Sequence, residues 1–196
     1  MKERPILFSG PMVLAILDGR KTQTRRIVNR TNSGRVKLAA SARNWHIDDP
    51  NVVLACRYGQ PSDRLWVRET WADMGTGHTA YRATTDDDTA ALMSWKPSIH
   101  MHRWRSRLTL EIIDVRIERL QDITKEDAIE EGIQPIHSEI PGEPNWKDYS
   151  DPIPFDHEHP IASYRTLWET INGTGSWNSN PWVWVITFHA CNLTAP

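Results

Sequence analysis

Long apolar runs are absent from this sequence of 196 residues, and none approaches the ~20 residues that a membrane-spanning helix requires. Cysteine is scarce, since only Cys56 and Cys191 occur, which excludes a disulfide framework and a cysteine-rich zinc motif. The first ten residues, MKERPILFSG, lack the long apolar core of a secretory signal peptide. These absences predict a cytoplasmic protein with two free thiols and no membrane association.

An excess of one charge is also missing, because the net charge is only −2, but the charges are distributed unevenly along the chain. Residues 1–37 contain nine Lys or Arg against two acids, whereas residues 118–160 contain twelve acids against three Lys or Arg. Such segregation allows a basic binding face on a weakly acidic protein. The densest basic stretch, GRKTQTRR at residues 19–26, is therefore the first candidate for a functional site.

Hydrophobic periodicity predicts helices and strands in a mixed order. Apolar spacing together with Pro, Thr and Gly end signals predicts helices at residues 11–18, 123–132 and 161–171. Alternating or continuous apolar residues predict strands at 21–28, 65–72, 107–120 and 181–188, with 51–59 as a further candidate. The apolar phase of the 107–120 strand changes near Ile112, which indicates a β-bulge.

This order lacks regular alternation of strand and helix, and it predicts an α+β domain with a mixed sheet or small β-barrel flanked by helices. The length favours a single domain over residues 1–196. Stretches without periodicity predict loop insertions near 35–60, 73–100 and 133–160, the last of them rich in proline.

Four segments occur in an order that resembles a known family: ILDGRKTQTRR, LWVRETWA, RIERLQDITKEDAIEEGI and LWETINGTGSWNSNPWVWVITF. Together they are similar to the ASCH-domain family of the PUA-like superfamily, and most of all to its longer phage and prophage members. The resemblance covers most of the chain outside about 35–60 and 135–160. It implies a small mixed β-barrel flanked by helices, with a cleft suited to RNA or a modified nucleoside.

One branch of this family hydrolyses the amide of N4-acetylcytidine with a lysine, a threonine and a glutamate. Its motif G-R-K-T-x-T-x-R matches GRKTQTRR, which places the lysine at Lys21 and the threonine at Thr24. The glutamate falls on Glu131, with Glu130 one residue away. The resemblance therefore implies an amidohydrolase that needs no cofactor, with Thr24 as nucleophile, Lys21 as its base and Glu131 as the acid that protonates the leaving amine.

The residues themselves are compatible with this chemistry. A threonine hydroxyl is inert unless a neighbour takes its proton, and a lysine does so only when burial or nearby cations lower its pKa. Cations next to Lys21 in the sequence, which can also bind substrate or a developing oxyanion, are Arg20, Arg25 and Arg26. On an ideal strand Lys21 and Thr24 point to opposite faces, so they converge only if Lys21 precedes the regular strand. We predict that Lys21, Thr24, Arg26 and Glu131 line one cleft.

Two further groups are candidate binding residues. In HMHRWRSR, residues 100–107, Arg103 and Arg105 can hold phosphates while Trp104 stacks on a base, and the alternative is a charged edge strand. In LWVRETWA, Arg68 and Glu69 can line the site as an ion pair, and the alternative is a structural salt bridge.

Other features point to no site, and two other functions stay open. His157 and His159 lack a third ligand with typical spacing, so we expect no metal site, and Tyr164 has only a packing role. The expected partner is a modified nucleoside or RNA, and a monomer is favoured. The first open alternative is a non-catalytic RNA-binding module in which the same cations hold phosphates. The second is a metal-independent ribonuclease in which Lys21 stabilises a phosphorane and Glu131 is the acid.

Overall fold

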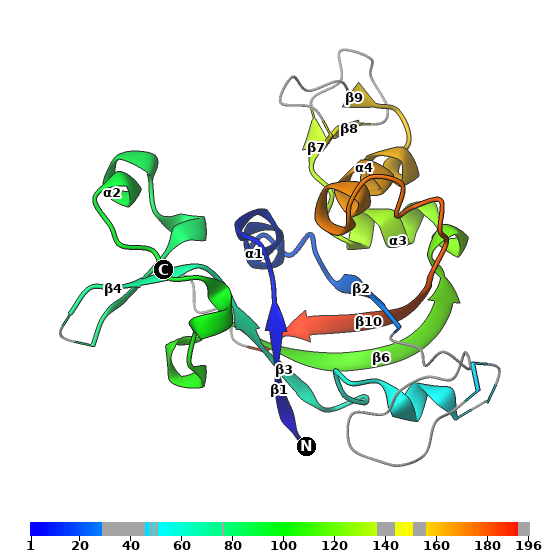
Figure 1. The fold of residues 1–196 in the computed structure, drawn as a ribbon, viewed down its shortest axis with the longest axis horizontal. Coiled ribbons are helices and arrows are strands. Elements are labelled where there is room, and N and C mark those ends of the chain that lie inside the picture. The colour runs from blue at the N-terminus through cyan, green and yellow to red at the C-terminus, as the bar shows by residue number, and fades with distance from the viewer. Residues whose placement is uncertain are drawn as a thin grey trace.

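The computed structural model describes residues 1–28, 46–47, 49, 51–75, 77–136, 144–150 and 156–191. Five strands form one mixed sheet in the order β1-β3-β6-β10-β2 (Figure 1). These are β1 (Glu3–Leu7), β2 (Gln23–Ile27), β3 (Arg64–Arg68), β6 (Thr109–Arg119) and β10 (Trp182–Ala190). Among the described strands of this sheet, only β1 and β3 pair in parallel. The α+β class is thus confirmed, while β1 and β2 remain edges, so the described residues form an open sheet rather than a closed barrel.

Three helices lie over the sheet on the side of β2 (Figure 1): α1 (Gly10–Leu17), α3 (Lys125–Glu130) and α4 (Pro160–Asn172). All three were expected from the sequence. Pro11 lies in the first turn of α1, where its missing N–H costs no hydrogen bond, and Gly19 follows the helix with a positive φ of 73°. Thr124 caps α3 by accepting a hydrogen bond from the backbone N–H of Asp127. None of the helices in the described residues has the length and apolar character needed to cross a membrane.

The central strand β6 pairs with the whole of β10 from Leu110 to Arg119 and carries the predicted bulge. Their register shifts so that Thr187 lies opposite Asp114 while Phe188 lies opposite Ile112, which leaves Ile113 unpaired and half exposed. The extra residue turns Ile112 and Val115 toward the same buried face, where a strict alternation would separate them. The bulge therefore keeps both halves of β6 in the core.

Two sequence expectations for strands were wrong. The strand expected over 65–72 is broken into β3 and β4 (Trp71–Asp73), because β3 pairs with β1 and β6 while Trp71 turns away to pair with Tyr81 and Lys96. The candidate strand at 51–59 contains a 3₁₀ helix, Val52–Ala55, in which the N–H groups of Leu54 and Cys56 donate to the carbonyls of Asn51 and Val53. Apolar runs of this length do not distinguish a strand from a short buried helix.

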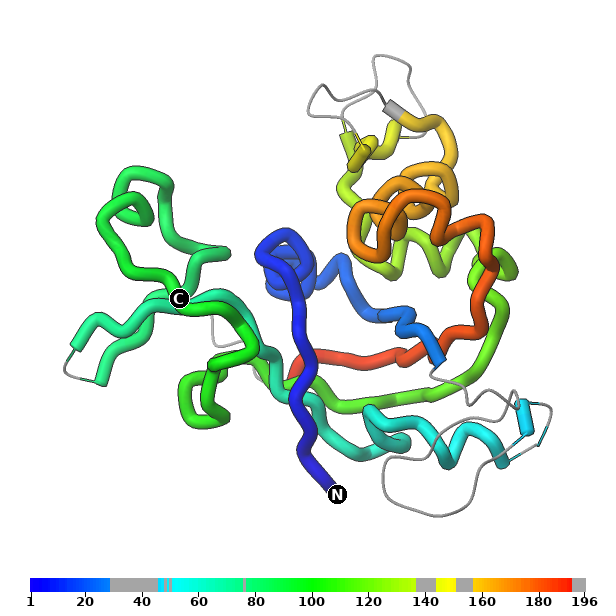
Figure 2. Tube along the Cα trace, in the orientation of Figure 1, coloured from blue at the N-terminus to red at the C-terminus, as the bar shows by residue number. Residues whose placement is uncertain are grey.

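The predicted insertions contain small structured elements. Residues 71–75 and 77–107 form an arm that projects from the sheet (Figure 2), with β4, β5 (Thr79–Tyr81) and α2 (Asp87–Ala91). The described part of 133–160 contains a small sheet of β7 (Pro135–Ile136), β8 (Asn145–Lys147) and β9 (Asp156–His157). Of the insertion expected near 35–60, residues 35–45, 48 and 50 lie outside the described residues. The remaining 3₁₀ helices are Arg82–Thr84, Ser98–His100, Arg103–Arg105 and Leu120–Asp122.

Candidate active site

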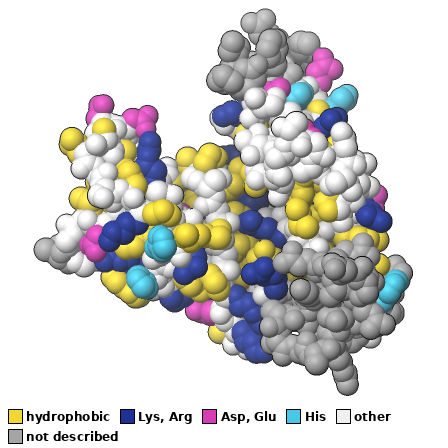
Figure 3. Space-filling view, in the orientation of Figure 1, with side chains coloured by type: hydrophobic (Ala, Val, Ile, Leu, Met, Phe, Trp, Pro, Cys, Tyr) yellow, Lys and Arg dark blue, Asp and Glu magenta, His cyan; other side chains and the backbone are white. Residues whose placement is uncertain are grey.

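A cavity of about 490 Å³ lies between the edge strands β1 and β2 and α4. Charged and polar side chains from the α1–β2 region and from the end of α3 line one side: Lys21, Thr24, Arg25, Arg26 and Glu131. Aromatic and apolar side chains of α4 line another: Tyr164, Leu167, Trp168 and Ile171. Figure 3 shows Lys and Arg side chains along the middle of this face, between the arm and the α3–α4 region. The volume falls within the range of small-molecule sites, which is about 300–1,000 Å³.

Lys21 reaches the cavity because it precedes the regular strand. The backbone N–H groups of Arg20 and Lys21 both donate to the carbonyl of Ala15 at 2.9 Å, so the chain is still turning out of α1 at this point. Lys21 then forms an isolated antiparallel bridge with Glu131, and β2 begins only at Gln23. Lys21 and Thr24 therefore line the same cavity, which meets the condition that the sequence set for their convergence.

Gly132 allows α3 to approach this junction closely. Its φ is +83°, and a Cβ added here would lie 2.7 Å from the Cβ of Lys21 and 2.9 Å from that of Ala15. A side chain at this position would therefore be both strained and in collision with Lys21. The glycine that ends the helix thus also determines the contact between Lys21 and Glu131.

The Lys21–Glu131 pair is the centre of the candidate site. The Lys21 Nζ donates to Glu131 Oε2 at 2.9 Å and to the Glu131 backbone carbonyl at 2.7 Å. The two side chains are only 2% and 4% exposed. Burial lowers the pKa of Lys21 below its ordinary value; Glu131 opposes this effect, and the nearby charges of Arg26 and Arg25 add to it. The result is a lysine that gives up its proton more easily than a surface lysine.

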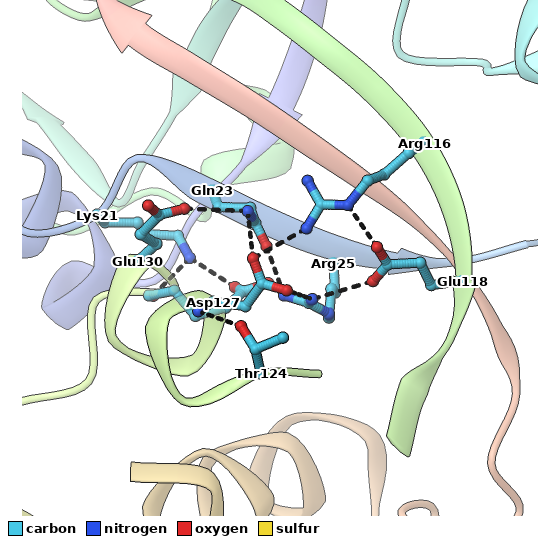
Figure 4. Close-up of polar contacts among 9 residues, drawn as sticks. Lys21, Gln23, Arg25, Arg116, Glu118, Thr124, Asp127 and Glu130 are labelled. Carbon is cyan, nitrogen blue, oxygen red and sulfur yellow. Dashed lines mark hydrogen bonds and ion pairs between the residues drawn. The ribbon is translucent and has the colours of Figure 1, made fainter. Parts of the chain in front are cut away.

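Arg25 is buried within a network of carboxylates behind this pair. Figure 4 shows Gln23 and Arg25 directed toward Asp127. Arg25 Nη2 lies 2.8 Å from Asp127 Oδ2 and 3.2 Å from Glu118 Oε2, and its Nη1 lies 3.4 Å from Glu131 Oε1. Burial favours a raised pKa for Asp127, but the hydrogen bond from Gln23 and the charge of Arg25 outweigh it and hold this pKa below its ordinary value. Arg25 therefore orients Glu131 rather than offering a free cation to substrate.

Arg26 lies on the face of β2 opposite to that of Arg25. Its side chain bridges the two edge strands of the sheet, β2 and β1. Its Nη2 donates to the carbonyl of Leu7 at 2.6 Å, and its guanidinium lies 5.1 Å from the centre of the Phe8 ring. The Lys21 Nζ lies 5.6 Å from the same ring. Phe8 thus keeps an apolar surface against both cations, which strengthens the electrostatic coupling between them.

Tyr164 is a site residue that the sequence interpretation assigned only to packing. It is buried in α4 and lines the cavity. Burial first, and then the charge of Glu131, raise the pKa of Tyr164 well above its ordinary value, so its phenol stays protonated and available as a donor. The indole N–H of Trp168, also in the cavity wall, is buried without a hydrogen-bond partner in the described part of the chain. An amphipathic helix pattern in the sequence does not show that Tyr164 and Trp168 line a cavity, because residues that only pack in the core give the same pattern.

Three residues proposed for binding lie outside the cavity lining. Arg20 donates to the carbonyl of Gly132 at 3.2 Å and pairs with Asp18 at 3.0 Å, so it ties the end of α1 to the end of α3. Arg68 donates to the carbonyl of Met101 at 3.1 Å and stacks over Trp66. Glu69 is buried and makes a two-pronged ion pair with Arg107, both contacts at 2.9 Å, so its charge partner is Arg107 rather than Arg68.

The Arg103–Trp104–Arg105 group also lies away from the cavity, on the arm. It forms a 3₁₀ helix rather than an alternating strand, so its arginines do not line up on one face. Arg103 pairs with Glu3 at 2.9 Å, and Arg105 pairs with Asp73 at 2.6 Å while stacking on the exposed ring of Trp104. The positive charges of Arg103 and Arg105 are thus both paired with acidic side chains of the protein itself.

Comparisons with family models, with curated proteins and with solved structures give no match to this chain.

Proposed function

We propose that this protein is an ASCH-type amidohydrolase that removes the acyl group from N4-acylated cytidine. The observation that carries the proposal is the convergence of Lys21, Thr24 and Glu131 on one cavity, with Lys21 and Glu131 in direct contact at 2.9 Å. These are the three residue types that the chemistry needs: a hydroxyl nucleophile, a base and an acid. The aromatic wall of α4 suits a planar base, and the volume suits a nucleoside.

In the first half of the proposed reaction, the Thr24 hydroxyl attacks the acyl carbonyl carbon and its proton passes to neutral Lys21. The carbon–nitrogen bond then breaks, and protonated Glu131 gives its proton to the departing N4 amine. Cytidine leaves, and the acyl group remains as an ester on Thr24. Lys21 is now an ammonium and Glu131 a carboxylate, which is the ion pair expected of their 2.9 Å contact.

In the second half, water attacks the ester carbonyl while the Glu131 carboxylate takes its proton. The bond to Thr24 breaks, and the Lys21 ammonium returns a proton to the threonine oxygen. The acid is released, and Lys21 and Glu131 are both neutral again. One proton transfer along the Lys21–Glu131 contact relates the charged and neutral pairs, and burial favours this transfer because it lowers the pKa of Lys21.

The direct test is incubation of the purified protein with N4-acetylcytidine, followed by chromatography. We expect cytidine and acetate in equal amounts. Absence of turnover by the wild type at several pH values would reject the proposal. Cleavage of an unmodified oligonucleotide that is lost in Lys21→Ala would favour a ribonuclease instead.

Lys21→Arg separates catalysis from binding. Arginine keeps the positive charge but cannot be deprotonated, so it cannot act as the base. We expect hydrolysis to fall at least ~10²-fold, which is the usual contribution of a general base. Affinity for the nucleoside, measured by calorimetry, should change less than about tenfold, because the charge remains. Unchanged hydrolysis in Lys21→Arg would remove Lys21 from the role of base.

Arg26→Gln should move the alkaline limb of the pH profile of kcat/KM. The active pair carries one proton, so activity falls at high pH as the pair loses it, and this limb lies below the ordinary lysine pKa because burial and Arg26 lower the pKa of Lys21. Removing the Arg26 charge raises the pKa of Lys21, so the limb should shift to higher pH. Arg165→Gln, on the exposed side of α4, is the control and should leave the limb in place. A limb that stays fixed or moves to lower pH in Arg26→Gln would contradict the assignment.

A further inference from the structure

Three side chains of types that bind metal ions meet at the end of the β6–β10 pair, one from β6, one from the end of β10 and one just beyond it. Glu111 lies directly opposite His189 in the antiparallel register. Cys191 directly follows the end of β10 at Ala190, and its backbone N–H donates to the carbonyl of Thr109 at 2.8 Å, so hydrogen bonding to β6 extends to this residue. Side chains two residues apart on a strand share a face, so all three point the same way.

This face is the one opposite the candidate active site. Phe188 and Ile112, the neighbours of His189 and Glu111 along each strand, are buried in the core. Alternation along β6 and β10 therefore directs Glu111, His189 and Cys191 to the outer face of the sheet. His189 is exposed and the other two are partly exposed, so a dissolved ion can reach them.

We infer that Glu111, His189 and Cys191 form a binding site for a soft divalent cation of the zinc class. One ligand atom from each residue lies within 4.8 Å of the other two, and Cys191 Sγ is 3.9 Å from Glu111 Oε2. Zinc bonds of about 2.0–2.3 Å in tetrahedral geometry require ligand atoms about 3.3–3.8 Å apart. Side-chain rotations that move the ligand atoms by about 1 Å bring them to the spacing that zinc requires, and the exposed imidazole allows such a rotation.

The ligand set selects the type of cation. Thiolate and imidazole favour zinc, whereas calcium and magnesium require several oxygen ligands. Arg64 lies opposite Glu111 on β3 and offsets part of the negative charge on which a hard cation depends. Three protein ligands leave a fourth position for water or another ligand. The spacing of these residues in the sequence gives no indication of the site, because Glu111 is far from His189 and Cys191. Only the pairing of β6 with β10 brings the three together.

Cobalt(II) titration of the reduced, chelator-treated full chain tests this inference, because a thiolate–cobalt bond gives a charge-transfer absorption band. We expect the band in the wild type, its loss on addition of zinc, and its absence in Cys191→Ser. Cys56→Ser is the matched control: Cys56 is buried in the core, and its removal should leave the band intact. His189→Ala, at an exposed position that the fold does not need, should weaken cobalt binding at least ~10-fold.

A wild type without the band would overturn the inference, as would a band that survives Cys191→Ser or that disappears in Cys56→Ser. The inference does not rest on the proposed hydrolysis. Because the site lies on the opposite face of the sheet, zinc should leave the turnover of N4-acetylcytidine unchanged, and the two proposals can therefore fail separately.

Discussion

Thr24→Val is expected to reduce hydrolysis of N4-acetylcytidine at least ~10³-fold, since it removes the attacking hydroxyl from the reaction. Valine has nearly the same shape as threonine, and Thr24 is buried in a strand that pairs with β10 at Ile186, so the fold should persist. The measurement is kcat for cytidine release. Circular dichroism and thermal unfolding of the variant check that the fold is retained.

Two companion variants make the result specific. Thr24→Ser keeps a hydroxyl at the same position and should retain activity within about tenfold. Thr22→Val alters the other threonine of the motif, which lies in the junction before β2 and outside the cavity lining, and should leave kcat nearly unchanged. A fully active Thr24→Val would show that water, rather than Thr24, attacks the acyl group. Equal losses in Thr22→Val and Thr24→Val would indicate a structural effect on the motif.

Lys21→Met is expected to lower the free energy of unfolding by about 3–5 kcal/mol, the usual cost of removing one partner from a buried ion pair. Glu131 would lose its nearest charged partner in a site where its side chain is only 4% exposed, with the more distant Arg25 contact at 3.4 Å as partial compensation. Chemical denaturation followed by circular dichroism measures this difference. The effect is large because the carboxylate loses its partner and gains no water.

The double variant Lys21→Met/Glu131→Gln provides the decisive comparison. It also replaces the unpaired Glu131 carboxylate by a neutral amide, so its free energy of unfolding should be about 2 kcal/mol higher than that of Lys21→Met. Arg165→Met is the control for a partly exposed pair, since Arg165 and Glu169 lie 4.0 Å apart on the surface of α4, and it should change stability by less than about 1 kcal/mol. A double variant that is less stable than Lys21→Met would show that Glu131 is held by other contacts.

Among the described elements, local signals in the sequence predicted three of the four α-helices and four of the five strands of the main sheet, all but α2 and β1. Pro11 and Gly19 mark the ends of α1, and Thr124 and Gly132 mark those of α3, because caps and breakers act within one turn of the chain. The phase change near Ile112 predicted the bulge in β6 for the same reason. The break after β3 escaped prediction because the new partners of Trp71, which are Tyr81 and Lys96, are chosen by tertiary pairing.

The residues of the candidate site also fall into two groups, those that the sequence indicated and those that only the tertiary structure placed there. The sequence alone brought attention to Lys21 and Thr24, which lie three residues apart in one motif. Only the tertiary structure decided that Glu131, and not Glu130, enters the cavity: Glu130 turns to Gln23 at 3.1 Å, while Glu131 meets Lys21 at 2.9 Å. It also decided that Arg25 is neutralised internally by Asp127 and Glu118, and that Tyr164 lies in the cavity wall.

The physical reason is the range of the interactions. Caps, turns and periodicity act between neighbours along the chain and can be read from composition. The partner of a charge depends on which distant element folds against it, so composition and periodicity did not relate the basic segment around Lys21 to the acidic segment around Glu131. Only the family resemblance implied that relation, and the packing of α3 beside β2 provides the contact. The sequence thus determined that positive and negative charge would be segregated along this chain. Folding decided that the two segments neutralise each other beside one cavity.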